Sequence, residues 1–140
     1  LEGACLRRSD LRGAILRGAN LTGADMTEAD LREGAIAQVD KEKGLAMLTH
    51  TAQQSDAGKA NFTGANLAGS KMAGMTAQTA DFTDAVLLGA RMIRANLRGS
   101  SFHGANLEGA DLSGADLTGV DFTDSVMIGT KMAMATTGGM

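Results

Sequence analysis

The side chains of this 140-residue chain that could serve nucleophilic catalysis are Cys5, His50 and His103. Attack by a cysteine thiolate requires a histidine base within hydrogen-bonding reach of the sulfur. Cys5 and His103 fall at outward positions of the repeat described below and several coils apart, while His50 belongs to an irregular segment with no evident partner. We therefore expect no catalytic residues and no enzymatic activity.

Carboxylates could also act as acid/base pairs or metal ligands, and the chain has 16 Asp and Glu residues. Their placement is regular, because an Asp repeatedly stands directly before a large apolar residue, at Asp10, Asp25, Asp30, Asp81, Asp111, Asp116 and Asp121. Asp in such positions accepts hydrogen bonds from backbone amides in turns, which is a structural role. The pattern differs from the calcium-binding nonapeptide repeat, and no phosphate-binding glycine motif occurs. The sequence predicts no metal site and no cofactor.

Composition excludes several further classes of function. The formal net charge of −3 lacks the basic excess that phosphate neutralisation requires, so we expect no direct binding of nucleic acid. No apolar run approaches the roughly 18 residues of a membrane span, and no basic-then-apolar leader is visible. A single cysteine gives no reason to expect an oxidising compartment. We expect a cytoplasmic protein that does not enter a membrane.

The positions of the apolar residues repeat every five residues, as in Ala19–Gly23 (ANLTG) and Ala105–Gly109 (ANLEG). The large central residue recurs from Leu1 to Ile36 and again from Phe62 to Met132, and a small apolar residue usually stands two positions before it. Residues two apart share one face of an extended segment, whereas a five-residue step on a helix turns by about 140° and forms no stripe. The sequence predicts a solenoid of very short strands with an outward polar surface.

All four phenylalanines are central residues and are spaced by 20: Phe62, Phe82, Phe102 and Phe122. Four pentapeptides per coil would stack these rings in one internal ladder, with about 4.8 Å between neighbours. On this register Arg91, Asp111 and Lys131 share one outward column. Around Met75 and Ala77 the large and small residues exchange places, so that core volume is conserved.

This A(D/N)Lxx pattern resembles the pentapeptide-repeat family over residues 1–38 and 60–140. The resemblance implies an all-β fold, a right-handed quadrilateral parallel β-helix with a packed interior. Most members of the family have no assigned function. A minority resemble double-stranded DNA, protect DNA gyrase from quinolones or natural poisons, and dimerise through their C-terminal ends.

Residues 39–59 interrupt the repeat, because the central positions step by 26 residues from Ile36 to Phe62. We interpret this segment as a projecting loop with a short helix that begins near Asp40, although a degenerate extra coil remains open. The chain is then one domain, 1–140, with an insertion. Since Leu1 is already a central residue, we expect the chain to be a piece of a longer protein.

Aliphatic side chains at outward or terminal positions form the candidate surface for a partner or for self-association: Val86, Leu88, Ile93, Val126, Ile128, Met132 and Met134. Outward aliphatic residues on a solenoid indicate a contact surface. We expect a non-catalytic protein-interaction scaffold with an unidentified protein partner, and a homodimer through the C-terminal coil. The alternative is a DNA-mimicking regulator or protector of DNA gyrase.

Overall fold

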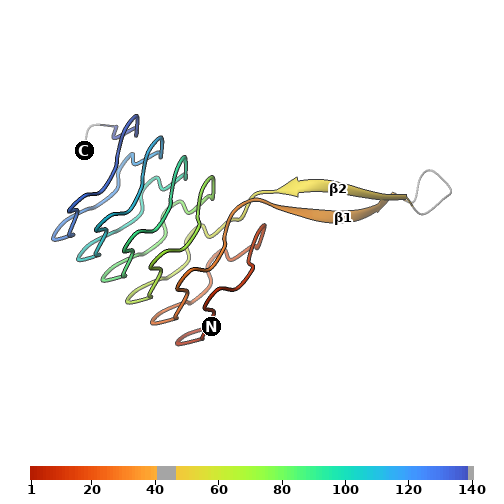
Figure 1. Ribbon diagram of the computed structural model, residues 1–140, viewed down its shortest axis with the longest axis horizontal. Helices are drawn as coiled ribbons and strands as arrows, with labels where there is room; N and C mark the ends of the chain where they lie inside the picture. Colours follow the sequence, from red (N-terminus) through yellow and green to blue (C-terminus); the bar gives the residue numbers. More distant parts are fainter. Residues whose placement is uncertain (41–46, 139–140) are drawn as a thin grey trace.

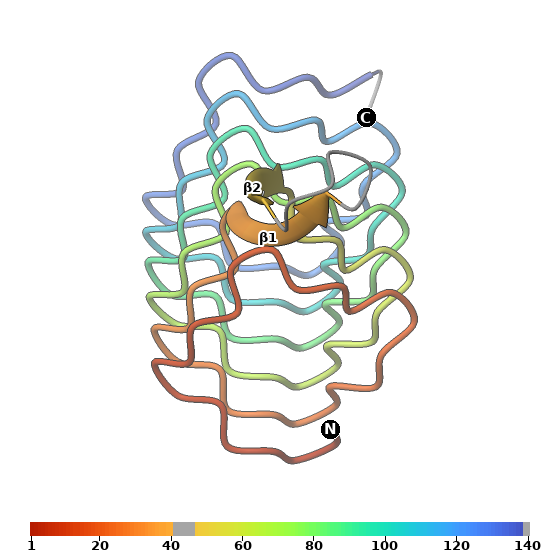
Figure 2. The ribbon, with the colours of Figure 1, turned by 90° about the vertical axis from the view of Figure 1, so that its right-hand side faces the viewer.

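The computed structural model describes residues 1–40 and 47–138, which form a stack of four-sided coils and one projecting hairpin (Figures 1 and 2). No helix occurs within these ranges. Each pentapeptide contributes one residue that bridges the coils above and below, then its central residue, then a tight turn. Bridges join residues 20 apart, such as Asn61 and Asp81, so four pentapeptides complete one coil, as predicted.

The bridging residues form four outward columns, one on each side of the coil, and we name the sides after them. Wall A contains Asn20, Asn61, Asp81, Ser101 and Asp121. Wall B contains Cys5, Asp25, Asn66, Val86, Asn106 and Val126. Wall C contains Asp10, Asp30, Lys71, Arg91, Asp111 and Lys131, which confirms the predicted column of Arg91, Asp111 and Lys131. Wall D contains Ile15, Asp56, Thr76, Asn96, Asp116 and Thr136.

Hydrogen bonds between coils and within corners satisfy most of the backbone. The N–H of Phe82 donates to the carbonyl of Ser101 on the next coil (2.7 Å), and the N–H of Ala85 donates back to the carbonyl of Phe82 across the corner (3.0 Å). The residue at the corner has a positive φ, which glycine adopts without strain, as in Gly104 (67°). The same corner holds Asp84 at 57°, so the coil imposes this conformation on other residues too.

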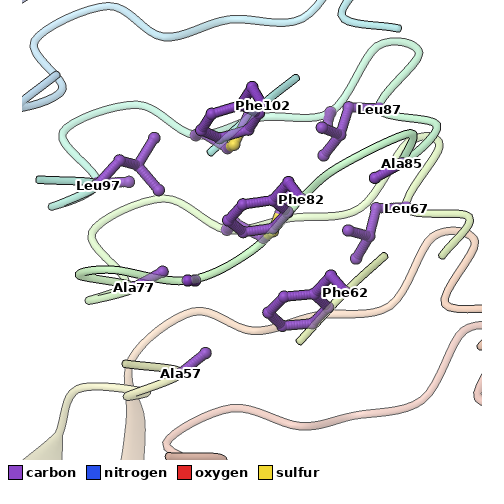
Figure 3. Packing of buried hydrophobic residues seen from close by; sticks show 14 of the residues in the cluster. Ala57, Phe62, Leu67, Ala77, Phe82, Ala85, Leu87, Leu97 and Phe102 are labelled. Carbon is purple, nitrogen blue, oxygen red and sulfur yellow. The ribbon is translucent and has the colours of Figure 1, made fainter. Parts of the chain in front are cut away.

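The core is a set of internal columns, and the phenylalanine ladder is confirmed (Figure 3). Ring centroids are 4.8 Å apart for Phe62 and Phe82, 4.6 Å for Phe82 and Phe102, and 5.4 Å for Phe102 and Phe122. The first three rings are fully buried. Met75 and Ala77 are also buried, which confirms that the large and small residues exchange places there.

The insertion is a β-hairpin, which corrects the prediction of a loop with a short helix or an extra coil. β1 (Gly34–Asp40) pairs antiparallel with β2 (Met47–Gln53), from Gly34 opposite Gln53 to Asp40 opposite Met47. The hairpin extends well clear of the coils (Figure 1). Part of the expected helix, residues 41–46, lies outside the described residues.

The predicted boundaries of the insertion, 39–59, are also wrong, because the coil is left after Glu33 and resumed at Ser55. Ala57 is a buried central residue whose N–H donates to Thr76 (2.7 Å), so Ser55–Lys59 is an ordinary pentapeptide of wall D. The step from Leu31 to Ala57 is again 26 residues. The sequence predicted the insertion one repeat too late, because Ile36 has the large side chain typical of a central residue and Ala57 does not.

The hairpin is anchored at the corner between walls C and D. Gly34 passes so close to the neighbouring coil that a Cβ atom there would lie 2.6 Å from the carbonyl oxygen of Arg12. The side-chain amide of Gln53 donates to the carbonyl of Gly13, and the buried hydroxyl of Ser55 donates to the carbonyl of Leu31. These contacts let the chain leave and rejoin the coil without disturbing the stacking.

Candidate interaction surface

The structure does not bring Cys5 and His103 together. Cys5 is exposed on wall B. His103 is exposed on wall A, where its Nε2 lies 4.0 Å from a carboxylate oxygen of Asp124. His50 belongs to β2, and its side chain lies outside the described residues. Within the described ranges, no three His, Cys, Asp or Glu side chains are grouped so that they could hold a metal ion.

The regular aspartates and asparagines have the structural role predicted for them. Asp81 accepts hydrogen bonds from the backbone N–H of Thr83 (2.9 Å) and from its hydroxyl (2.5 Å). Asp116 and Thr118 repeat this pair of bonds, and the amide oxygen of Asn61 accepts the equivalent backbone bond. The Thr118 hydroxyl and then its backbone N–H lower the pKa of Asp116, because they stabilise the ionised carboxylate. These side chains hold the turns.

The predicted aliphatic surface is divided between two walls. Val86 and Val126 share the bridging column of wall B, and Leu88 and Ile128 stand two residues after them. We call these four residues the wall B patch. Ile128 is 68% exposed, Val126 40% and Leu88 39%. Asn106 separates the two valines by one coil, so the patch covers three coils.

The other three predicted residues lie elsewhere. Ile93 and Met134 are on wall C, where they line a hollow of about 560 Å³ together with Ser113, Gly114 and Ala133. Met134 is 93% exposed. Met132 is a central residue, half-buried against the core. The seven residues therefore form no single surface.

Charge is distributed unevenly among the walls, which sequence reasoning missed. On wall A and the corner after it, the charged side chains are all acidic apart from His103, and they are Glu2, Asp81, Asp84, Asp121 and Asp124. Wall C instead has Lys71 and Arg91 on adjacent coils. The sequence does contain this uneven distribution of charge, because residues 20 apart share a wall. The net charge hides it, because it sums the charges of all four walls.

The arginines of the N-terminal coils are held in ion pairs between or within coils. Arg8 Nε lies 2.7 Å from Glu28, and Arg12 forms two bonds of 2.8 Å with Asp10. The side-chain bonds from Arg12 lower the pKa of Asp10 to about 2. Because these pairs are exposed, each stabilises the fold little.

Comparison with known proteins matches the model of pentapeptide repeats to residues 1–33, 60–99 and 100–135, in eight copies. The chain belongs to the pentapeptide-repeat family. Its fold is therefore the right-handed β-helix expected from the resemblance, and the unmatched stretch 34–59 contains the hairpin and the Ala57 pentapeptide.

Two solved pentapeptide-repeat structures are similar in fold. Rfr23 from the cyanobacterium Cyanothece 51142 is 24% identical with a TM-score of 0.51, over 85% of this chain and 64% of that one. AT2G44920 from the Arabidopsis thaliana thylakoid lumen is 21% identical with a TM-score of 0.53, over 85% of this chain and 68% of that one. This pentapeptide-repeat chain thus spans less than two thirds of the length of Rfr23.

A third solved structure, QnrB1, a plasmid-mediated fluoroquinolone resistance protein, is 11% identical with a TM-score of 0.42, over 91% of this chain and 67% of that one. At this level the similarity supports no transfer of function. No curated sequence relative was found. None of the described residues forms a helix long and apolar enough to cross a membrane.

Proposed function

We propose that this pentapeptide-repeat rod is a non-catalytic protein-interaction scaffold whose partner surface is the wall B patch. The observation that carries the proposal is the exposure of three large aliphatic side chains, Leu88, Val126 and Ile128, at outward positions. Polar residues occupy the corresponding positions of the coil between them, Asn106 and Glu108. Such positions need no aliphatic side chain for folding, so their apolar character supports a contact with another molecule.

The stacking of the coils also favours binding. Val86 and Val126 stand two coils apart in one bridged column, so their separation is fixed at about 9.6 Å. A rigid surface loses little conformational entropy when a partner docks on it. The patch alone is small for a stable interface, so a partner would also contact its polar surroundings.

The test compares partners bound by the wild type, by Ile128→Asp and by Ala133→Asp. Ala133 is exposed on wall C of the same coil, so its substitution adds the same charge outside the patch. Affinity purification followed by mass spectrometry should show proteins retained by the wild type and Ala133→Asp but lost with Ile128→Asp. Identical sets of bound proteins for all three would reject the patch.

A second copy of the chain is one partner that this comparison can identify directly. We propose a homodimer that includes the C-terminal coil, because Ile128 and Met134 of this coil are the most exposed large apolar side chains among the described residues. Light scattering should give a dimer mass for the wild type and for Gln78→Asp, whose exposed side chain lies on wall D outside the C-terminal coil, and a monomer mass for Ile128→Asp. A monomer mass for the wild type at all concentrations would exclude the dimer.

Wall A supports a second candidate function, a DNA-mimicking regulator or protector of DNA gyrase. Its aspartates give one side of the rod a negative potential with no lysine or arginine to offset it. A supercoiling assay with gyrase and a fluoroquinolone should show protection that Asp81→Asn with Asp121→Asn weakens. Asparagine keeps the turn bond, as Asn61 does, so folding is preserved. Asp111→Asn on wall C is the control, and an absence of protection at micromolar rod would end this proposal.

We also propose a cytoplasmic location, which the single cysteine supports since Cys5 cannot form an internal disulfide. Cell fractionation with an antibody against the rod would check this location.

A further inference from the structure

Wall C contains a notch produced by one short side chain between two long ones. The register places Asp30 beside Lys71 and Lys71 beside Arg91. Two residues further along the same strands, Arg32, Ala73 and Ile93 therefore stand side by side. Ala73 fills far less space than its two neighbours, so the surface is hollowed above it. The hollow has a volume of about 320 Å³ and is lined by Arg32, Lys71, Ala73, Arg91 and Ile93.

The notch is lined by three cations and by no carboxylate among the described residues. Arg32 is fixed by Asp30, to which its Nη2 and Nε donate at 2.7 and 2.9 Å. Lys71 and Arg91 have no ion-pair partner within 4.0 Å in the described part of the chain. The two cations stand on adjacent strands of their column, and the carboxylates that flank them there, Asp30 and Asp111, are not among the residues that line the notch.

We propose that this notch, defined by Arg32, Lys71, Ala73, Arg91 and Ile93, binds a phosphate-type oxyanion. A doubly charged tetrahedral anion presents several acceptor oxygens, and it can be bonded by the Lys71 ammonium and the Arg91 guanidinium together. Arg32, held in place by Asp30, closes one side with a third positive charge. Ala73 leaves the room that the anion needs.

The wall itself provides matched variants. Ala73→Ile fills the notch without changing its charge, and the coil accepts isoleucine at the equivalent Ile93. Lys71→Gln and Arg91→Gln each remove one cation. Lys131→Gln removes a cation of the same column two coils away from Arg91, outside the notch.

Binding is measured by titrating inorganic phosphate, and separately O-phosphoserine, at constant ionic strength while following backbone amide shifts by NMR. We expect saturable shifts around Lys71 and Arg91. The dissociation constant should rise by about two- to fivefold in Lys71→Gln and in Arg91→Gln, as for exposed ion pairs. It should rise similarly in Ala73→Ile and stay unchanged in Lys131→Gln.

Each outcome decides the proposal. Binding of both probes means that the notch accepts a phosphoryl group attached to a larger molecule, and binding of inorganic phosphate alone means a site for the free ion. An absence of saturable shifts for both, an equal loss in Lys131→Gln, or unchanged binding in Ala73→Ile would overturn it. No protein partner is needed in the measurement, so its result is independent of the scaffold function.

Discussion

Substitution of Phe82 by alanine tests the stacked architecture most directly. Phe82 is fully buried and is the middle ring of the ladder, 4.8 Å from Phe62 and 4.6 Å from Phe102. Removal of a buried phenylalanine side chain costs about 3–5 kcal/mol. Two ring contacts are lost together, each worth about 0.5–1.5 kcal/mol beyond the area buried. We expect a loss near the upper end of the range, about 4–5 kcal/mol.

The size of this effect should depend on position in the ladder. Phe122 is only half-buried and has one neighbouring ring, 5.4 Å away and tilted by 23°. Phe122→Ala should therefore cost about half as much, ~2 kcal/mol. Phe82→Leu should cost under about 2 kcal/mol, because leucine conserves most of the volume and already occupies this column at Leu21.

Thermal unfolding followed by circular dichroism gives the comparison. For a chain of this size, the expected loss lowers the Tm of Phe82→Ala by about 10–15 °C, against about 4–8 °C for Phe122→Ala. The Tm of Phe82→Leu should lie closer to that of the wild type. Equal shifts for the two alanine variants, or a Phe82→Leu variant as unstable as Phe82→Ala, would refute the argument that contacts along the column determine stability.

Three further predictions concern a buried hydroxyl, the anchor of the hairpin and acid. Ser70→Ala should raise stability by about 1 kcal/mol in urea unfolding, because the buried Ser70 hydroxyl has no hydrogen-bond partner among the described residues. Ser100→Ala should instead lower stability, because the Ser100 hydroxyl donates to Ala77 at 2.7 Å. Gly34→Ala should lower the Tm by several degrees, since its Cβ meets the Arg12 carbonyl, and an unchanged Tm would contradict this contact. Hydrogen bonds, chiefly from the Arg12 and Thr118 side chains, lower the pKa values of Asp10 and Asp116. The Tm should therefore be constant above about pH 5 and fall from pH 4 towards pH 2 as these carboxylates gain protons. A Tm that does not change with pH would exclude the effect.

The coil could be predicted from the sequence because two residue spacings, both visible in the sequence, determine it. A spacing of five separates the central residues, and the spacing of 20 between phenylalanines gives the number of sides. The exchange of Met75 and Ala77 could also be predicted, since it conserves volume locally. The hairpin boundaries could not, because Ile36 has the side chain of a central residue but belongs to β1, whereas Ala57 is central and small.

The candidate surfaces were only partly accessible from the sequence. Outward aliphatic residues such as Ile128 follow from the repeat, and so does their division between walls B and C, because all of them lie after the hairpin. The notch around Ala73 depends on which residues flank it on neighbouring coils, and Arg32 is 41 positions away because the hairpin intervenes. Composition conceals the acidic side at Asp81 and Asp121, since arginines elsewhere cancel its charge.

The hairpin departs from one corner of a coil and returns to that same corner, so every residue downstream keeps the neighbours it would have had in an unbroken stack. The hairpin could therefore become longer or shorter, or be replaced, during evolution without any change in the stacking of the coils. A foreign epitope grafted between Gly34 and Gln53 would keep these two anchoring residues and would be displayed at one defined corner of one defined coil.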